Sequence, residues 1–529
     1  MKIFPKLLIV CFVLMIFSCN RSKDTIILKK PANKEVAELN IPIDSNTVLA
    51  FYKSYPKLSL YQTEVLKLYQ KQGSKQLWLD NKGVVEFGNT LFNKYRGLPD
   101  EGLKANFPYN DDINQVFERT SKNKLSQIDT DLMITNLYFY YSEKVFHGVD
   151  EKTSQSLEWL LPRKKLNYQV FSDSIFKNSA INDDRKSKMF SQYYKLRDVL
   201  KQYREIEKNG GWKAIEVSDD FKNFKIGDSA VGIAQIRERL FITGDLKENS
   251  KSAVCDSVLI SAVKNYELHH GKKPKNIILP EHIKEMNVSV SDRIKTIIVN
   301  MERCRWIDPK LEKDKEFIEV NIPEFKLYII RDGEISFVSP VVVGKAMTKT
   351  VVFSGMMQYI VFSPYWNVPQ SIINQEIKPG MAKDKNYLAK KNLEWNNGQV
   401  RQLPGSNNSL GLVKFLFPNS NNIYLHDTPS KSLFERETRA FSHGCVRVGK
   451  PRDLAIELLK GDSSWTPERI DKAMHGGKEK WYTLKKKVPV YIGYFTAWVD
   501  RDGNLNFYDD IYQRDQSLIQ LLTEEKPVE

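Results

Sequence analysis

A chain of 529 residues is too long for one hydrophobic core, so we expect three or four domains. Its content of 41% hydrophobic and 11% aromatic residues is typical of a globular protein and excludes a largely disordered one. The formal charge of +15 would suit nucleic acid, but the export signal described next argues against that partner. A solvated basic face is the simplest explanation of the charge, and an anionic cell wall or membrane surface is the second.

The N-terminus carries a predicted export signal. Two lysines accompany an unbroken apolar run over residues 7–17, which is too short to span a bilayer and has the length of the hydrophobic part of a signal peptide. We therefore expect a signal peptide over residues 1–18 and a polar tether over residues 19–46. No later stretch of the sequence is long and apolar enough to predict a transmembrane helix.

The letters IFSC at residues 16–19 resemble a bacterial lipobox, which implies a lipid on Cys19. A plain secretory signal with an incidental cysteine is the alternative. A lipid on Cys19 would attach the protein to a membrane of the cell envelope, facing the periplasm. Asn20 is not an obvious inner-membrane retention signal, so we expect the outer rather than the inner membrane.

Three cysteines remain after the signal and Cys19 are set aside, namely Cys255, Cys304 and Cys445. Three cysteines do not make a disulfide framework, and an odd thiol in an exported protein is a candidate reactive group. A pairing of Cys255 with Cys304 stays open at this point.

Residues 47–220 predict a helical scaffold domain. Apolar side chains recur at a spacing near 3.6 residues over residues 58–70 and again over residues 129–149. A further helix is expected between the turn signals DNKG at residues 80–83 and RGLPDEGL at residues 96–103. No reactive group of side chains stands out in this half of the chain.

A second, smaller helical module is expected over residues 221–300. One helix lies within residues 224–246 and another opens at Asp256, a good N-cap residue, and closes at Gly271. The neighbouring His269 and His270 have no third metal ligand nearby in the sequence, so we expect a polar helix end there.

The pattern changes to strands after residue 301, which predicts a mostly β domain over residues 301–510 and a C-terminal tail over residues 511–529. Alternating β-branched and aromatic residues flank the letters RDGE at residues 331–334, a hairpin signal. A long polar excursion over about residues 369–411 interrupts the strands, and we interpret it as a flap over a site.

The stretch YLHDTPSKSLFERETRAFSHGCVRVGK, residues 424–450, holds the candidate chemistry. A cysteine attacks a carbonyl well only when a nearby base takes its proton and backbone N–H groups stabilise the oxyanion. His426 ends a strand-like run and could supply the base for Cys445. Gly444 permits a tight turn in which N–H groups converge.

Two other interpretations of these residues stay open on residue types alone. A zinc ion could be bound by His426, His443 and Cys445, although neither a CxxC nor an HxxxH spacing supports it. Alternatively, Cys445 could be an inert, buried cysteine that lies near the histidines by chance.

The same stretch resembles the active-site signature of L,D-transpeptidases with the YkuD fold, in which a histidine, a spacer of about fifteen residues and Ser/Thr-His-Gly-Cys follow one another. Further likeness to the large multidomain subgroup typified by YcbB comes from VNIPEFKLYIIRDGEISFVSPVVVGK, FSPYWNVPQSI, LGLVKFLFPN and NIYLHDTP. The resemblance implies a multidomain α+β protein with a helical scaffold domain, a small peptidoglycan-binding-like helical module and a mostly β catalytic domain with an inserted flap.

The resemblance also implies roles for individual residues. Cys445 would be the nucleophile and His426 its general base, oriented by the backbone carbonyl of Asp427. The N–H groups of Gly444 and Cys445, with that of His443, would form the oxyanion hole. The remaining motif and pocket-wall candidates are Ser442, His443, Arg447, Tyr424, Tyr365 and Trp366. Arg447 would also pair with a substrate carboxylate.

The implied reaction joins two peptidoglycan stem peptides without a metal or an organic cofactor. The thiolate would attack the amide of a diamino acid in a donor tetrapeptide, release D-Ala and leave a thioester, which the side-chain amine of an acceptor stem resolves into a cross-link. The alternatives are an L,D-carboxypeptidase or amidase that trims or cleaves wall peptides, and a non-catalytic wall-binding lipoprotein.

Overall fold

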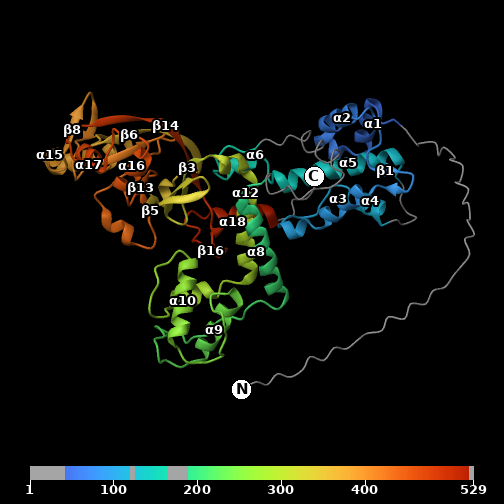
Figure 1. The fold of residues 1–529 in the computed structure, drawn as a ribbon, viewed down its shortest axis with the longest axis horizontal. Helices are drawn as coiled ribbons and strands as arrows, with labels where there is room; N and C mark the ends of the chain where they lie inside the picture. The colour runs from blue at the N-terminus through green and yellow to red at the C-terminus, as the bar shows by residue number, and fades with distance from the viewer. Residues whose placement is uncertain (1–41, 119–124, 165–188, 524–529) are drawn as a thin grey trace, which may run out of the picture. The chain divides into compact units, whose positions relative to one another are not determined.

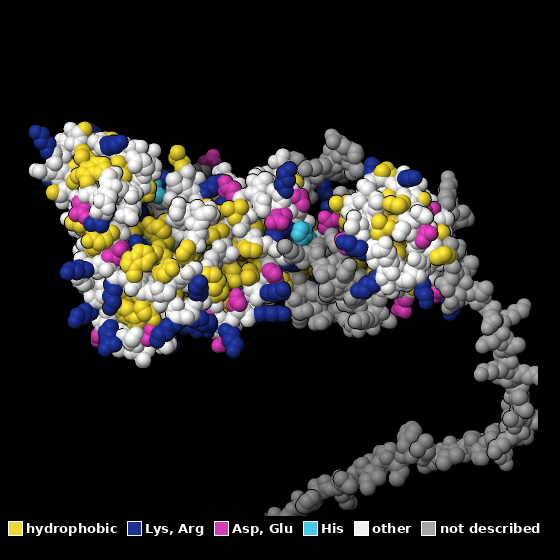
Figure 2. All heavy atoms as spheres, turned by 90° about the horizontal axis from the view of Figure 1, so that it is seen from above, with side chains coloured by type: hydrophobic (Ala, Val, Ile, Leu, Met, Phe, Trp, Pro, Cys, Tyr) yellow, Lys and Arg dark blue, Asp and Glu magenta, His cyan; other side chains and the backbone are white. Residues whose placement is uncertain are grey.

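The computed structural model describes residues 42–118, 125–164 and 189–523 (Figure 1). The expected signal peptide, Cys19 and most of the expected tether lie outside these residues. Within the described ranges, none of the helices combines the length and apolarity that a membrane crossing requires. Lys and Arg side chains lie at many places over the described surface, interspersed with hydrophobic and acidic ones (Figure 2).

The N-terminal region is helical, as expected for a scaffold domain. Its elements are α1 (Ser45–Ser54), η1 (Pro56–Tyr61), α2 (Gln62–Lys71), β1 (Leu79–Asp80), β2 (Gly83–Val84), α3 (Glu86–Arg96), η2 (Leu98–Glu101), α4 (Asn110–Phe117), α5 (Gln127–Phe146), α6 (Glu151–Ser156) and α8 (Ser191–Lys208). Helix α5 is buried from Thr130 to Ser142, so it is a central helix and not an amphipathic surface helix. Its buried Asp131 accepts hydrogen bonds from the backbone N–H groups of Leu77 and Trp78, which anchors the chain before β1.

The small helical module has a hydrophobic core of its own, formed by buried residues between Ile215 and Met286. Its helices are α9 (Val231–Thr243), α10 (Ser257–His269) and α11 (Pro280–Met286). The carboxylate of Asp256 accepts from the N–H of Leu259 at 2.8 Å, which is the expected N-cap.

The end of α10 differs from the expected polar end. His269 pairs with Asp245 at 2.7 Å, but His270 is buried and stacks on Tyr266 with ring centroids 3.9 Å apart. His270 also hydrogen-bonds through Nδ1 to the carbonyl of Tyr266 at 2.7 Å, so this histidine is a buried, satisfied side chain and not part of an exposed polar end.

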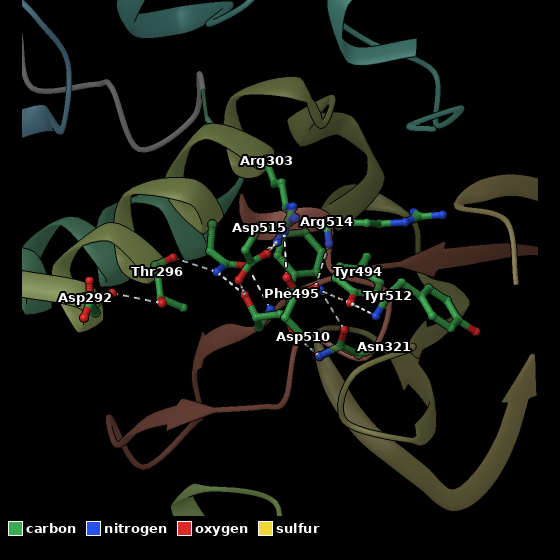
Figure 3. Close-up of polar contacts among 12 residues, drawn as sticks. Asp292, Thr296, Arg303, Asn321, Tyr494, Phe495, Asp510, Tyr512, Arg514 and Asp515 are labelled. Carbon is green, nitrogen blue, oxygen red and sulfur yellow. Dashed lines mark hydrogen bonds and ion pairs between the residues drawn. The ribbon is translucent and has the colours of Figure 1, made fainter. Parts of the chain in front are cut away.

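Two helices run across or beyond the domain boundaries that were expected at residues 300 and 511. Helix α12 (Val290–Trp306) runs through residue 300, where the module was expected to end, and it packs against α8 and α18 (Arg514–Thr523). Helix α18 occupies most of the stretch that was expected to be a tail. Arg303 of α12 pairs with Asp515 of α18 at 2.7 Å (Figure 3). The hydroxyl of Thr496 donates to the same carboxylate at 2.6 Å. The C-terminal segment is therefore part of the fold.

The mostly β domain is built on a nine-stranded sheet. Its strands lie in the order β12-β5-β13-β11-β10-β6-β14-β3-β4, and β4 also pairs with β5, so the sheet curls back on itself. Their bounds are β3 (Glu316–Asn321), β4 (Lys326–Arg331), β5 (Glu334–Gly344), β6 (Phe353–Phe362), β10 (Val413–Leu416), β11 (Leu425–His426), β12 (Ala440–Ser442), β13 (Val446–Val448) and β14 (Lys480–Gly493). The expected hairpin joins β4 to β5 through Asp332 and Gly333, which both have positive φ.

Shorter elements complete this domain. They are η4 (Pro309–Lys313), η5 (Ala346–Thr348), η7 (Lys431–Glu435), α16 (Pro451–Leu459), α17 (Pro467–Met474) and the hairpin of β15 (Ala497–Val499) with β16 (Leu505–Phe507). One continuous hydrophobic core extends from the scaffold helices into the sheet. The sheet therefore shares its core with the helical region, while the small module does not.

The flap is a folded unit and not a polar loop. It contains α13 (Gln370–Ile372), η6 (Ile373–Ile377), α14 (Lys378–Lys383) and α15 (Tyr387–Lys390), together with a three-stranded sheet of β7 (Trp366–Asn367), β9 (Gln399–Gln402) and β8 (Leu393–Asn396). Its own apolar cluster consists of Val368, Ile372, Ile373, Ile377, Leu393 and Val400. A private core of this kind lets the flap keep its shape independently of the main sheet.

Cys255 and Cys304 are free thiols in the described structure, so the pairing left open by the sequence does not form. Both are fully buried, Cys255 in the core of the small module and Cys304 on α12. Burial raises the pKa of each thiol, which makes them unreactive packing residues.

Candidate active site

Two adjacent parallel strands bring the candidate catalytic residues together. β11 and β13 pair with Leu425 opposite Val446 and His426 opposite Arg447. Cys445 immediately precedes β13 and lies beside Tyr424, whose carbonyl accepts the N–H of Val446 at 3.2 Å. Side chains two residues apart point to the same face of a strand, so Cys445 points to the same face as Arg447. Arg447 is the partner of His426, and the candidate nucleophile and base therefore share one face.

The His426 side chain is held in one orientation by the chain that follows it. Its Nδ1 hydrogen-bonds to the carbonyl oxygen of Asp427 at 2.5 Å. A carbonyl can only accept, so Nδ1 carries the proton and Nε2 is left as the acceptor. The ring is only 5% exposed, and burial, aided by the positive charges of Arg447 and Lys414, lowers the pKa of His426 to about 3. The imidazole is therefore a neutral base at rest.

The carboxylate of Asp427 has a different task from its carbonyl. It accepts from the N–H of Leu412 at 2.9 Å and from that of Thr428 at 2.7 Å, and it pairs with Lys431. A Cβ on Gly411 would lie 2.3 Å from this carboxylate, so the approach requires glycine there. The carboxylate fixes the backbone that carries the carbonyl against His426.

The turn from Ser442 to Cys445 is closed by a side chain. The hydroxyl of Ser442 donates to the carbonyl of Cys445 at 2.5 Å and accepts the N–H of Gly444 at 3.1 Å. Gly444 has φ of +115°, a conformation that other residues rarely adopt. Since the N–H of Gly444 is engaged by Ser442, it is not free to bind an oxyanion, contrary to the expectation from the sequence. Within the described residues, the N–H groups of His443 and Cys445 have no acceptor.

The Cys445 thiol is half-buried and makes only weak polar contacts. It lies 3.7 Å from the carbonyl oxygen of Asn422 as a donor, and the hydroxyl of Tyr424 hydrogen-bonds to the sulfur. Burial raises the pKa of Cys445, and hydrogen bonds from Tyr424 and the charge of Arg447 offset part of this effect. A neutral thiol on the same face of the sheet as a neutral imidazole is thus the resting arrangement.

The other expected site residues are distributed as follows. His443 is exposed at the turn, while Arg447 lies on the face of His426 with its Nε buried and without a hydrogen-bond partner in the described chain. The Tyr365 ring lies under the guanidinium of Arg401 at 4.1 Å, and Trp366 packs against the flap core, so both form the root of the flap.

A metal site was one of the interpretations that the sequence left open. In the part of the chain that the structure describes, no group of three or more His, Cys, Asp or Glu side chains is placed to hold an ion. His426 already uses Nδ1 to bond to Asp427, and the exposed His443 lies at the turn.

The structure adds a support for the turn that sequence reasoning missed. The hydroxyl of Thr350 donates to the carbonyl of Gly444 at 2.8 Å and accepts the N–H of Gly344 at 2.9 Å. The hydroxyl of Tyr512 accepts the N–H of Thr350 at 3.1 Å and donates to the carbonyl of Gly344 at 2.6 Å. Tyr512 was expected in a tail, and no sequence signal connects it with the turn.

Comparison with protein families agrees with this arrangement. Residues 315–471 match the L,D-transpeptidase catalytic domain, YkuD, and residues 63–200 match the scaffold domain. The protein carries a YkuD-type L,D-transpeptidase catalytic domain. The expected combination of a helical scaffold region and a mostly β L,D-transpeptidase domain in one large multidomain chain is confirmed.

Individual relatives cover part of the protein. A putative L,D-transpeptidase of Haemophilus influenzae is 34% identical over an alignment of 256 residues, and the match covers 44% of this chain and half of that relative. Among solved structures, an L,D-transpeptidase from Mycobacterium smegmatis aligns with 34% of this chain and 58% of its own, at 12% identity and a TM-score of 0.20. One from Xylanimonas cellulosilytica aligns with 52% of this chain and all of its own, at 11% identity and a TM-score of 0.19. Because both scores are low, the domain assignment rests on the family models.

Proposed function

We propose that this protein is a peptidoglycan L,D-transpeptidase that forms direct cross-links between two diamino acids through a thioester on Cys445. The observation that carries the proposal is the placement of Cys445 and His426 on one face of adjacent strands in a YkuD-type domain. The free N–H groups of the turn and the fixed tautomer of His426 support it.

The first half-reaction begins from the neutral pair. As Sγ of Cys445 attacks the amide carbonyl at the L-centre of the donor diamino acid, Nε2 of His426 takes the thiol proton. The developing oxyanion is stabilised by the N–H groups of His443 and Cys445. When the tetrahedral intermediate collapses, the C–N bond breaks, the leaving D-Ala amine takes the proton from His426, and a thioester remains.

The second half-reaction transfers the acyl group to an amine. The side-chain amine of an acceptor stem attacks the thioester carbonyl and gives a proton to His426, and the C–S bond breaks as Cys445 recovers that proton. Water in place of the amine would make the same site an L,D-carboxypeptidase, which is the second candidate activity.

Two further parts of the proposal concern location and partners. We propose that the protein is a lipoprotein of the cell envelope, attached through Cys19 to the outer rather than the inner membrane, on the basis of the lipobox-like residues 16–19. The small helical module, with its private core, is proposed to bind peptidoglycan.

The test is incubation of the purified protein with disaccharide-tetrapeptide and mass spectrometry of the products. The proposal predicts a dimer that has lost one D-Ala. Cys445→Ser should yield no dimer, whereas the control Cys255→Ser, which changes a buried thiol in the small module, should yield it at the wild-type rate. Monomeric tripeptide alone would support the carboxypeptidase instead, and a dimer from Cys445→Ser would contradict the proposed nucleophile.

A further inference from the structure

We propose that a pocket at the small helical module binds a carboxylate group of the cell wall, with the guanidinium of Arg239 and the hydroxyls of Tyr203 and Tyr266 as donors. This inference rests on the proposed binding of peptidoglycan by the module, and it adds the place of contact and the chemical group that is recognised. The residues that line the pocket do not overlap with those of the candidate active site.

The pocket is a cavity of about 200 Å³ at the ends of α9 and α10. Its walls come from the module, from α8 and from the hairpin that contains β16, and the side chains that matter here are Tyr203, Arg239, Asp245, Tyr266, His269 and Phe507. A pocket for a drug-sized ligand has roughly 300–1,000 Å³. This smaller cavity therefore fits the charged end of a ligand and not a length of glycan chain.

Arg239 is a buried cation without a carboxylate partner. Two other buried arginines in and beside the module each have one: Arg237 pairs with Asp256 at 2.6 Å. Arg293 pairs with Glu285 at 2.5 Å. The side chain of Arg239 is equally buried, at 2% exposed, but within the described residues it forms no ion pair. A buried charge that lacks a close counter-charge is unfavourable, so an anion that enters the cavity would be stabilised.

The guanidinium of Arg239 is held in place but keeps an unused donor. Its Nε donates to the carbonyl of Met286 at 3.0 Å, and its Cζ lies 3.7 Å from the centre of the Trp212 ring. Nη1 is buried and has no hydrogen-bond partner in the described chain. An arginine does not release its proton to relieve such a position, so the free N–H groups remain available to an acceptor.

Two tyrosine hydroxyls in the same cavity are also unused. That of Tyr266 is buried without a partner, and that of Tyr203 makes no hydrogen bond with the residues that the structure describes. Burial raises the pKa of both hydroxyls, and the charge of Arg239 offsets part of that effect in each case. Both hydroxyls are therefore protonated donors in the field of the guanidinium.

Asp245 also lines the cavity, but it does not supply the missing counter-charge. One of its oxygens is hydrogen-bonded to Nδ1 of His269 at 2.7 Å, and the other accepts the hydroxyl of Thr243 at 2.8 Å. The hydrogen bond to Asp245 raises the pKa of His269, which favours the positive form of that ring. The charge that faces the cavity is therefore that of Arg239.

This set of donors fits a carboxylate better than a neutral group. A guanidinium and two hydroxyls can donate to both oxygens of a carboxylate, and the anion compensates the buried charge. A sugar hydroxyl would accept a hydrogen bond but would leave that charge unbalanced. Peptidoglycan offers carboxylates at the ends of its stem peptides and on muramic acids that have lost their stem.

The test is co-sedimentation of the full-length protein with insoluble peptidoglycan, which gives a dissociation constant without turnover. We expect Arg239→Gln to raise that constant roughly 10- to 100-fold, the range for a lost charge-assisted hydrogen bond. Tyr266→Phe keeps the ring and the net charge, and it should raise the constant about 3- to 10-fold. Thermal melting of each variant checks its fold, and Tyr266→Phe decides the question if Arg239→Gln does not fold.

Two matched controls separate the pocket from general effects. Lys247→Gln removes one positive charge from an exposed position of the same module outside the cavity, and Tyr52→Phe removes a buried hydroxyl from the scaffold region. Both should bind the wall as the wild type does. A loss of binding in Lys247→Gln as large as that in Arg239→Gln would show non-specific attraction by charge, and the proposal would be wrong.

Two treated walls identify the ligand. On peptidoglycan whose carboxylates have been converted to amides, the wild type should bind no better than Arg239→Gln, and a persistent difference between them would contradict a carboxylate ligand. Peptidoglycan freed of its stems by an amidase keeps the muramic acid carboxylates. A difference between wild type and Arg239→Gln that persists on this wall assigns the carboxylate to muramic acid, and one that disappears assigns it to the stem peptide.

The outcomes also distinguish the pocket from the proposed function. If both Arg239→Gln and Tyr266→Phe fold and bind intact peptidoglycan as the wild type does, the pocket holds only water and the inference is overturned, while the wall-binding module stands. If the wild type does not sediment with peptidoglycan, the module's role is overturned and the pocket with it. D-Ala release by the wild type from soluble tetrapeptide is measured separately and reports only on the reaction at Cys445.

Discussion

The imidazole of His426 is hydrogen-bonded through Nδ1 to the carbonyl of the next residue, Asp427. This local contact fixes the tautomer without a second carboxylate, since the Asp427 carboxylate is committed to backbone N–H groups and Lys431. The base is thus oriented by the strand end itself. Its low pKa, about 3, and the raised pKa of Cys445 describe a site that keeps both partners neutral until substrate binds.

The pH dependence of acylation follows from this neutral pair. The base becomes protonated only near its pKa of about 3, so D-Ala release should keep most of its rate between pH 7 and pH 5. The test is the rate of D-Ala release in single turnovers, measured from pH 7 to pH 5. An acid limb with a midpoint near 6.5, the ordinary value for histidine, would contradict the account.

The burial of His426 should also make the stability of the fold depend on pH. The folded pKa of His426 lies below its ordinary value of 6.5, so between pH 6.5 and about 3 the unfolded chain binds a proton that the folded chain does not. The free energy of unfolding therefore falls as the pH falls through this window, by at most about 1.4 kcal/mol per pH unit from this group. The free energy of unfolding of the His426→Gln variant, measured by urea denaturation, should decline less steeply as the pH falls through this range.

A second buried histidine provides the control for that experiment. Burial also lowers the pKa of His270, which ends helix α10 of the small module. His270→Gln should flatten the pH dependence of unfolding in a similar way but leave the pH profile of D-Ala release unchanged. If His270→Gln also changed the pH profile of D-Ala release, that profile could not be assigned to His426.

Gly444→Ala should damage the turn through backbone strain. Its φ of +115° is costly for a residue with a Cβ, on the order of 1–3 kcal/mol, while the nearest atoms to a new Cβ are 3.9 Å away. The effect therefore comes from conformation and not from a clash. Gly461→Ala is the matched control, because that glycine has open space and no positive φ. We expect kcat to fall at least tenfold in the first variant and to be unchanged in the second.

Tyr512→Phe tests the support beneath the turn. The variant removes one hydroxyl that bridges the backbone of Thr350 and Gly344, and Thr350 in turn holds the Gly444 carbonyl. Loosening the turn misplaces the N–H donors in the transition state, so kcat should fall several-fold with KM nearly constant. Tyr52→Phe removes a buried hydroxyl in the scaffold region and should affect only stability. Equal kinetics for both variants would contradict a positioning role.

The sequence was informative where the signals are local. The N-cap at Asp256, the hairpin at Asp332 and Gly333, and the strand end at His426 depend on a few neighbouring residues, and each lies where the pattern predicted it. The placement of His426 near Cys445 also followed from a spacer that matches a known motif.

The remaining features depend on contacts between distant segments. α18 is part of the fold because Asp515 meets Arg303 of α12, more than two hundred residues away, and no local pattern contains that pairing. The loss of the Gly444 N–H as an oxyanion donor depends on how the Ser442 hydroxyl points.

The central claim is that Cys445 carries the acyl group of the donor. Intact-protein mass spectrometry after incubation with tetrapeptide donor, without an acceptor amine, tests it most directly. The account predicts an adduct with the mass of the donor minus D-Ala, located on Cys445 by peptide mapping and absent from Cys445→Ser. An adduct on another residue, or D-Ala release by Cys445→Ser at the wild-type rate, would contradict it.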